Sequence, residues 1–185
     1  MTDSTTIYEC TDLGNALRFV YQHSSQLKVI DGSFTWLQWN GQRWELVSAA
    51  KAWQAAKATV ESIYHEGSNA NPSKARQLSQ WAQFSQSKAR MQAMLDLASK
   101  QQKMLVQLKS FDCHDLAVNT QSGLFFCNTG RVMPHEMTPM VTKITNAAYD
   151  RDAECQRFQQ FLDEIFGGDQ ELITWMQRAL GYSIL

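Results

Sequence analysis

The chain has 185 residues, of which 44% are hydrophobic and 11% aromatic, with 17 Lys and Arg against 18 Asp and Glu. This composition is too apolar and too nearly neutral for a disordered chain, and the length suits one domain or two small ones. No apolar run approaches the roughly 18 to 20 residues of a membrane span, and residues 1–10 lack the features of a signal peptide, so we expect a cytoplasmic protein.

The net charge of −1 hides an uneven distribution of charge along the chain. Residues 1–50 carry a net charge of −2, residues 51–110 carry +6 and residues 111–185 carry −5. A basic middle segment is either a surface that faces phosphates or the solvated face of helices, and the second is the more ordinary. The total charge therefore does not exclude a nucleic-acid partner.

An N-terminal helix and a β-meander are predicted over residues 12–47. Thr11 or Asp12 can cap the first turn of the helix, and two serines after His23 end it. Apolar residues at helical spacing predict a single buried stripe on this helix. The expected stripe consists of Leu13, Leu17, Val20 and Tyr21.

Residues 27–47 show the two-residue period of β-strands. Asp31-Gly32 and Asn40-Gly41 are dipeptides favoured in tight hairpin turns, the second as a type I′ turn. Three tryptophans fall within nine residues, namely Trp36, Trp39 and Trp44. They could stack nucleic-acid bases, but a sheet that packs on a helix needs the same residues, and we favour this core interpretation.

Residues 48–109 form the basic, helical middle of the chain. An amphipathic helix is predicted after Ser48 and ends at the polar segment from Glu66 to Pro72. One long helix is predicted over residues 73–99, which contain no Pro or Gly, and a further turn or two over residues 103–108. The buried side of the long helix is expected to hold Leu78, Trp81, Met91, Met94, Leu95 and Ala98.

Residues 111–145 predict a β-hairpin region, and residues 152–182 predict a pair of helices separated at Gly167-Gly168 and capped by Asp169. The apolar stripes of these helices are expected to face inward. They consist of Cys155, Phe158, Phe161, Leu162, Ile165 and Phe166 in the first helix, and of Leu172, Ile173, Trp175, Met176, Ala179 and Leu180 in the second. The whole pattern predicts a mainly α-helical α+β fold with two small antiparallel β elements, in one accessory domain over residues 1–185.

The sequence offers no recognisable metal site and no catalytic site. Its four cysteines lie far apart without a C-x-x-C pair, so we expect them to be reduced and mostly buried. The acidic pairs Asp163-Glu164 and Asp169/Glu171 stand at predicted helix ends, where acids commonly act as caps or stay solvated. An independent nuclease or hydrolase is therefore disfavoured.

Several blocks resemble one known family. The chain reads T-D-L-G-N over residues 11–15, W-x-x-W-x-G-x-x-W over residues 36–44 and F-D at residues 111–112, followed by a T-G…H…T-K hairpin block and a closing F-L…Q-R-A-L-G-Y-S-I-L block. These blocks are similar to the conserved N-terminal domain that precedes the superfamily 3 helicase motor in phage/plasmid and poxvirus-type primase-helicases. Residues 119–123 depart from the family pattern, which usually reads N-G before the hairpin block, and the absence of a phosphate loop is the more consequential departure. The family-motif positions are Asp12, Gly14, Asn15, Trp36, Trp39, Trp44, Gly130, Lys143, Gln177, Arg178, Gly181 and Tyr182.

This resemblance implies an accessory domain of a phage or plasmid DNA-replication protein whose parent chain is an ATP-dependent helicase or primase. The 185 residues contain no G-x-x-x-x-G-K-[ST] phosphate loop, so ATP and magnesium are expected in a motor that follows residue 185. The apolar end at Leu185 indicates a fragment of a longer chain. Self-association into a ring is expected through that parent chain.

Two functions follow from these observations. The first is DNA contact, domain coupling or hexamer assembly, with single-stranded DNA or a replication origin or fork as the partner. The alternative is a protein-interaction or oligomerisation module without nucleic-acid contact, motivated by the Met- and aromatic-rich helices. Basic residues that neutralise phosphates would make DNA binding salt-dependent. The candidate contacts are Lys88, Arg90, Lys100, Lys103 and Lys109.

Overall fold

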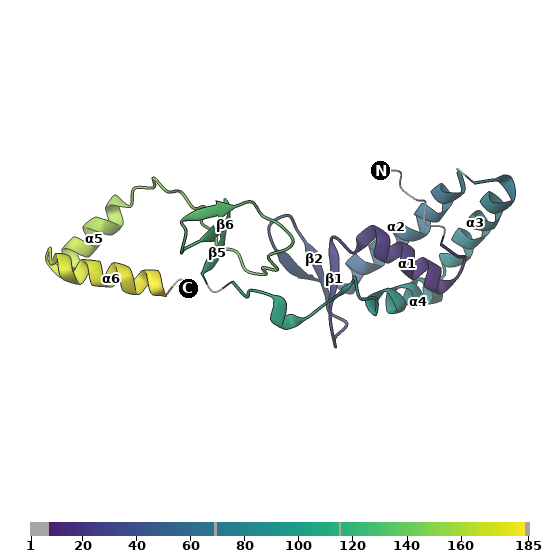
Figure 1. Ribbon diagram of the computed structural model, residues 1–185, viewed down its shortest axis with the longest axis horizontal. Coiled ribbons are helices and arrows are strands. Elements are labelled where there is room, and N and C mark those ends of the chain that lie inside the picture. Colours follow the sequence, from purple (N-terminus) through teal and green to yellow (C-terminus); the bar gives the residue numbers. More distant parts are fainter. Residues whose placement is uncertain (1–7, 69, 115, 184–185) are drawn as a thin grey trace. The chain divides into compact units, whose positions relative to one another are not determined.

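The computed structural model describes residues 8–68, 70–114 and 116–183, and the chain divides into two compact units (Figure 1). We call Met1–Asn40 with Trp44–Ser110 the N-terminal unit, and Gly41–Arg43 with Phe111–Leu185 the C-terminal unit. Each combines helices with a small sheet, so the predicted α+β, mainly helical fold class is confirmed. The single accessory domain stays a prediction. No helix in the described ranges has the length and hydropathy to cross a membrane.

Helix α1 (Asp12–His23) begins at Thr11, as predicted, but its buried stripe was predicted wrongly. Leu13, Leu17 and Tyr21 are exposed, and Tyr21 keeps 64% of its surface in water. Of the predicted stripe only Val20 is buried, and the buried face holds it together with Gly14, Asn15, Ala16, Arg18 and Phe19. Hydrophobic periodicity does not predict this face because two of its residues, Asn15 and Arg18, are polar. Both are buried and form their hydrogen bonds inside the unit.

A four-stranded sheet packs in the N-terminal unit with the strand order β3-β2-β1-β4. Strands β1 (Leu27–Ile30), β2 (Trp36–Trp39) and β3 (Trp44–Val47) form the predicted antiparallel meander. Its second turn is a four-residue loop between the paired residues Trp39 and Trp44, so the predicted two-residue type I′ turn is wrong. Gly41 adopts a φ of +101°, which requires a residue without a Cβ atom.

The fourth strand, β4 (Leu105–Val106), runs parallel to β1 and replaces the helical turn that was predicted over residues 103–108. The Met104 carbonyl accepts a hydrogen bond from the Val29 amide at 2.8 Å, and the Met104 side chain is fully buried. A 3₁₀ turn, η1 (Leu108–Ser110), follows. Pairing with a strand 76 residues earlier leaves no local periodic signal, which explains the error.

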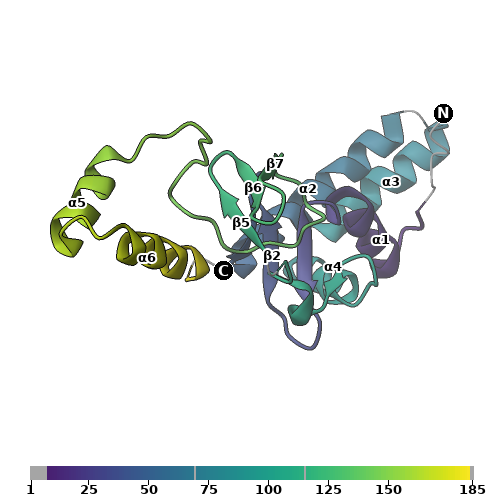
Figure 2. The same ribbon diagram turned by 60° about the vertical axis from the view of Figure 1, so that its left-hand side comes forward.

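Helices α2 (Ala49–Ser68), α3 (Pro72–Ser85) and α4 (Lys88–Ser99) complete the N-terminal unit. The single helix predicted over residues 73–99 is wrong, because Gln86 ends α3 and the Ser87 hydroxyl caps α4 by accepting the Arg90 amide hydrogen. The break lets α3 pack on α2 while α4 packs on α1 (Figures 1 and 2). A continuous helix could not bury both apolar stripes against different partners.

The main core of the N-terminal unit lies between the sheet and helices α1, α2 and α4. Phe19 from α1 meets Trp36 from β2 edge-on, with ring centroids 5.9 Å apart. A smaller cluster joins α2 to α3. The expected buried side of residues 73–99 is confirmed for Leu78, Met91, Met94, Leu95 and Ala98, while Trp81 is half-buried.

The C-terminal unit contains a three-stranded antiparallel sheet with the strand order β5-β6-β7. Its strands are β5 (Ala117–Thr120), β6 (Gly123–Phe126) and β7 (Arg131–Met133), which confirms the predicted hairpin region. The Phe125 ring stacks on the Tyr149 ring with centroids 4.0 Å apart, so the segment after the sheet is held against it.

Helices α5 (Gln156–Phe166) and α6 (Gln170–Tyr182) form the predicted pair, joined at Gly167 in the left-handed conformation and capped by Asp169. The inward-facing stripes were predicted correctly only in part: Leu162 and Ile173 are buried as predicted, and no other described residue of the two helices is buried. Phe166, Met176 and Ala179 are half-buried. Two packed helices share one narrow seam, and the remaining apolar residues fall outside it. The exposed large ones are Phe158, Phe161, Ile165, Leu172, Trp175, Leu180 and Tyr182.

All four cysteines belong to the described residues, and they form no disulfide. The prediction that they are mostly buried is wrong, because Cys10 is half-buried and Cys113, Cys127 and Cys155 are exposed. Cys127 directly follows β6 and Cys155 directly precedes α5, and such positions at element ends face solvent.

Candidate nucleic-acid interface

The T-D-L-G-N motif forms the start of α1. The Thr11 hydroxyl accepts a hydrogen bond from the Gly14 amide at 3.0 Å, which caps the helix. A Cβ atom built at Gly14 would lie 2.1 Å from the Glu9 carbonyl oxygen, so only glycine lets the preceding segment approach so closely. These motif residues therefore fix how the chain enters α1.

Asn15 ties α1 to α3 through a fully buried side chain. Its Nδ2 donates to the Ser85 Oγ at 2.9 Å, and its Oδ1 accepts from the Trp81 Nε1 at 2.9 Å. An amide with both ends hydrogen-bonded in the interior specifies one relative position of the two helices. The motif asparagine thus positions Trp81 at the surface of α3.

Arg18 is a buried cation that the sequence reasoning missed, with only 1% of its surface exposed. Its Nε and Nη2 donate to the two carboxylate oxygens of Glu66 at 2.7 and 2.8 Å. Its remaining donors reach the Glu9 and Tyr8 carbonyl oxygens, both at 2.9 Å. The guanidinium therefore joins α1, α2 and the segment before α1, and nothing in the local sequence pattern marks it.

Arg90 lies in a surface cluster at the junction of α3 and α4. Its Nη1 donates to the Asp12 Oδ1 at 2.8 Å. Its guanidinium carbon lies 4.7 Å from the Trp81 ring centroid and 4.0 Å from the Phe84 ring centroid. Cation–π contacts and an ion pair thus fix this arginine, while Phe84 keeps 59% of its surface in water.

The other predicted DNA contacts lie at two ends of α4 rather than in one cluster. Lys88 is the first residue of α4, and Lys100 follows its last, so α4 separates them by about 18 Å. The Lys100 Nζ donates to the Asp96 Oδ2 at 2.9 Å. Lys103 is exposed near the start of β4, and Lys109 is exposed within η1.

Lys28 on β1 joins the second of these ends, although the sequence reasoning did not select it. Its Nζ donates to the Lys103 carbonyl oxygen at 2.7 Å. Partial burial lowers the pKa of the Lys28 ammonium below its ordinary value. A lone lysine in a strand carries no motif, so only the pairing of β1 with β4 reveals its position beside Lys103.

The surface of α3 and the first turns of α4 are devoid of acidic residues. No Asp or Glu occurs from Gly67 to Leu95, whereas Lys74, Arg76, Lys88 and Arg90 do. The outer side of α3 carries an open hollow of about 340 Å³ lined by Pro72, Ser73, Arg76, Gln77 and Gln80. The segment itself thus presents cations and amides, and carboxylates reach this surface only from neighbouring elements, as Asp12 does at Arg90.

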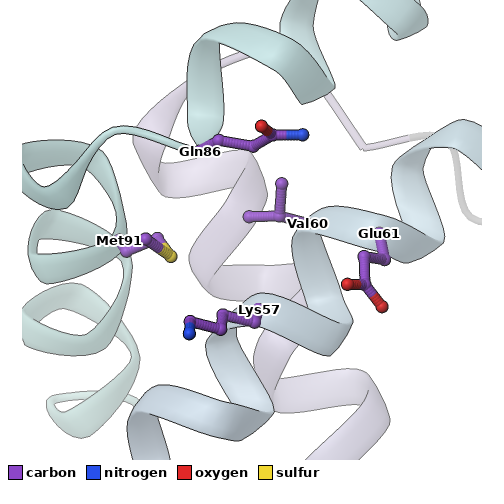
Figure 3. A pocket seen from close by; sticks show the side chains of 5 residues that line it. All are labelled: Lys57, Val60, Glu61, Gln86 and Met91. Carbon is purple, nitrogen blue, oxygen red and sulfur yellow. The ribbon is translucent and has the colours of Figure 1, made fainter.

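A second hollow, of about 310 Å³, lies between α2 and the α3–α4 junction (Figure 3). Val60 and Met91 face each other across it, with Lys57 near one end and Gln86 near the other. Glu61 also lines it. Because its walls carry one lysine and one glutamate, this hollow offers no net charge of one sign to a ligand.

The tryptophans of the W-x-x-W-x-G-x-x-W block lie mainly in the core. Trp36 and Trp44 are buried, and Trp39 is half-buried with its ring centroid 5.9 Å from that of Trp44. The favoured core interpretation is thus correct for Trp36 and Trp44. Bases cannot stack on either ring without unfolding the sheet.

The motif positions of the C-terminal unit stabilise backbone turns. Asp112 has a φ of +52°, a left-handed conformation that Asp tolerates better than most residues. Its Oδ1 accepts a hydrogen bond from the Thr142 amide at 2.8 Å, and its Oδ2 accepts one from the Thr142 hydroxyl. Gly130 (φ +66°) closes the β6–β7 turn, and the Lys143 carbonyl accepts from the Asn119 Nδ2 at 3.0 Å.

The last motif positions lie on α6. Gln177, Arg178, Gly181 and Tyr182 are all exposed there, and Tyr182 keeps 83% of its surface in water. Among the described residues, no three His, Cys, Asp or Glu side chains gather in a way that could hold a metal ion.

Comparison with known proteins gives one family. A family model described as "D5 N terminal like" matches residues 16–167, which is more than half of the chain. No curated protein matches the chain. The T-D-L-G-N motif and the α6 motif positions lie just outside the matched range. The chain belongs to the D5 N-terminal-like family, the N-terminal domain of D5-like primase-helicases of phages and poxviruses.

Proposed function

We propose that the N-terminal unit binds DNA through phosphate contacts on α3, α4 and the strands next to α4, within a DNA-replication primase-helicase. The observation that carries this proposal is the segment from Gly67 to Leu95, which contains four Lys and Arg residues and no Asp or Glu. Eleven Lys and Arg against eight Asp and Glu give this unit a net charge of +3, whereas six against ten give the C-terminal unit −4. A polyanion is attracted to the first and repelled by the second.

The proposed contacts keep the predicted lysines and add neighbours. Lys88, Lys100, Lys103 and Lys109 are exposed, and Arg76 lines the hollow on α3. Arg90 stays a predicted contact, but because its guanidinium is shared with Asp12, its charge is partly neutralised. We expect Arg90 to contribute less to phosphate binding than the exposed lysines.

A salt titration of DNA binding tests this proposal. The triple variant Lys88→Gln, Lys100→Gln and Lys103→Gln should weaken binding of single-stranded DNA and reduce the slope of log K against log salt by about 2, since each phosphate contact contributes about 0.7. The readout is the fluorescence anisotropy of a labelled oligonucleotide.

The matched control removes three exposed arginines of the C-terminal unit, in the variant Arg131→Gln, Arg151→Gln and Arg157→Gln. It should leave the slope unchanged. Equal slopes for the lysine variant and the wild type, or undetectable binding of the wild type to both single-stranded and duplex DNA at low salt, would refute the proposal.

A second candidate function, protein interaction or oligomerisation, is supported by the exposed apolar residues of α5 and α6. Phe161 and Ile165 each keep 52% of their surface in water and lie one turn apart on α5. Large exposed apolar groups gathered on one element are typical of interaction surfaces. Light scattering should then show association that Phe161→Glu abolishes and Gln160→Glu does not, whereas a strict monomer at high concentration would count against it.

The properties of the parent chain are proposals as well. ATP and magnesium would be bound by a helicase motor after residue 185, and self-association into a ring would occur through that longer chain. A cytoplasmic location and a role in domain coupling are likewise proposed. The family membership supports these proposals through its link to DNA replication.

A further inference from the structure

We infer that Phe84 is a platform on which one unpaired base of single-stranded DNA stacks, with Arg90 supporting the ring from behind. This inference rests on the proposed function and sharpens it by naming the form of DNA that the site prefers. It requires a ring with one covered face and one open face, cations in reach of the adjacent phosphates, and a rigid support.

The Phe84 ring satisfies the first requirement. It lies in the last turn of α3, and the Arg90 guanidinium carbon stands 4.0 Å from its centroid on one side. More than half of the Phe84 surface remains in water. A large exposed aromatic ring backed by a guanidinium is the arrangement in which a base can add to the stack by its π-face.

The support behind the ring is rigid because each member is held by another element. Asp12 of α1 fixes the Arg90 guanidinium by the 2.8 Å ion pair. Trp81, whose ring centroid lies 6.0 Å from that of Phe84, is fixed by its hydrogen bond to the buried Asn15. A platform that is already ordered costs little side-chain entropy when a base binds.

Groups suited to phosphate surround the platform. Gln80 and Gln77 lie one and two turns before Phe84 on the same exposed side of α3 and lead to the hollow that Arg76 lines. The exposed Lys88 begins α4 four residues after Phe84. Asp12 is the carboxylate in this cluster, and its Oδ1 accepts a hydrogen bond from Arg90. A single DNA strand that runs along α3 would therefore contact amides and cations on either side of the stacked base.

Stacking on Phe84 favours single-stranded DNA for a geometric reason. In a duplex both faces of each internal base are covered by its neighbours, so the ring can reach a π-face only after a base is unstacked. An unpaired base presents its face without that cost, which amounts to a few kcal/mol per step. The platform should thus discriminate between the two forms while the lysines bind both.

The experiment compares the full 185-residue chain with its Phe84→Ala and Phe84→Trp variants. The probes are a labelled thymidine oligonucleotide, an abasic strand of the same length and a duplex. Phe84→Ala should weaken binding of the thymidine strand about 5- to 150-fold, the range for one stacked base, whereas Phe84→Trp should retain it. The salt slope should not change, because no charge is removed.

The matched control is Leu46→Ala, which removes another exposed apolar side chain of the same unit and should change nothing. Binding of the abasic strand and of the duplex should be the same for the wild type and Phe84→Ala. Equal binding of the thymidine strand by both proteins, with a normal salt slope, would overturn the platform and leave the proposed function intact. An equal loss on the thymidine and abasic strands would also overturn it, because the loss would then come from a displaced Arg90 or a misfolded α3. Salt-independent or absent binding by the wild type would overturn both.

Discussion

The two units of this chain use polar residues in different ways. In the N-terminal unit, Arg18 and Asn15 are buried and join segments that are far apart in the sequence. In the C-terminal unit, Asp112 and Gly130 act on backbone turns, and most apolar residues of α5 and α6 stay exposed. Of the motif residues, Asn15 therefore makes a tertiary connection in the first unit, whereas Asp112 and Gly130 set turn geometry in the second. Substitutions in the first should cost more stability.

The largest effect is expected from Arg18→Met. Removing the guanidinium leaves Glu66 and two carbonyl groups without their donors, and breaking a buried ion pair costs about 3 to 5 kcal/mol. Because the Glu66 side chain is one-third exposed, we expect the low end, about 3 kcal/mol. Urea unfolding followed by tryptophan fluorescence measures it, since five of the six tryptophans lie in the N-terminal unit.

The control for Arg18→Met is Arg178→Met, which removes an exposed arginine of α6. Its effect should stay within about 0.5 kcal/mol, as for most surface substitutions. Equal unfolding midpoints for the two variants would contradict the assignment of Arg18 as the polar connection between α1 and α2.

Two motif glycines give the next comparison. Gly14→Ala forces a Cβ atom against the Glu9 carbonyl and should destabilise the N-terminal unit by about 2 kcal/mol. Gly181→Ala places its Cβ atom in open space on α6 and should stabilise that helix by up to about 1 kcal/mol. Urea unfolding measures both changes in stability, and the circular dichroism signal of the helices supports it. A loss of stability in both variants would show that the room for a Cβ atom does not determine the effect of the substitution.

A smaller effect is expected at Asp112. Asp112→Ala removes both hydrogen bonds to Thr142 and places alanine in the left-handed region, which costs about 1 to 2 kcal/mol. The effect should stay in the C-terminal unit. Hydrogen exchange should become faster at the Thr142 amide and stay unchanged at the Val29 amide, whose partner, the Met104 carbonyl, lies in the N-terminal unit. Faster exchange at both amides would contradict an effect confined to the C-terminal unit.

Local patterns predicted most of the elements, because turns and caps are encoded within a few residues. Thr11 and Asp169 cap helices, and the β2–β3 and β5–β6 hairpins form where the period of two indicated strands. Most errors fall where partners are distant in sequence, although the turn between β2 and β3 was also predicted wrongly. The β1–β4 pair, the break at Gln86-Ser87 and the rotated face of α1 each depend on contacts that periodicity does not contain.

The candidate site, like the fold, was predicted only in part. Charge counting located the basic segment but not its geometry, because α4 separates Lys88 from Lys100 and Arg90 pairs with Asp12, 78 residues away. Phe84 was not selected, since an aromatic residue in a helix is more often core than surface. Its exposure depends on the end of α3 at Ser85, which the sequence pattern did not reveal.

The smallest expected effect is a pH dependence at the α1–α2 contact. His23 is half-buried with its Nε2 3.1 Å from the Thr59 Oγ1, and burial lowers the pKa of this imidazole below its ordinary value of 6.5. The folded state therefore binds fewer protons than the unfolded state between the folded pKa and 6.5. The contribution of His23 to stability is fully present above pH 6.5 and is lost as the pH falls towards the folded pKa. The urea midpoint of the N-terminal unit should therefore decrease as the pH falls through this window. His23→Gln retains a polar side chain that does not titrate, so it should make this decrease smaller. An identical pH profile for the variant and the wild type would assign the effect to other groups.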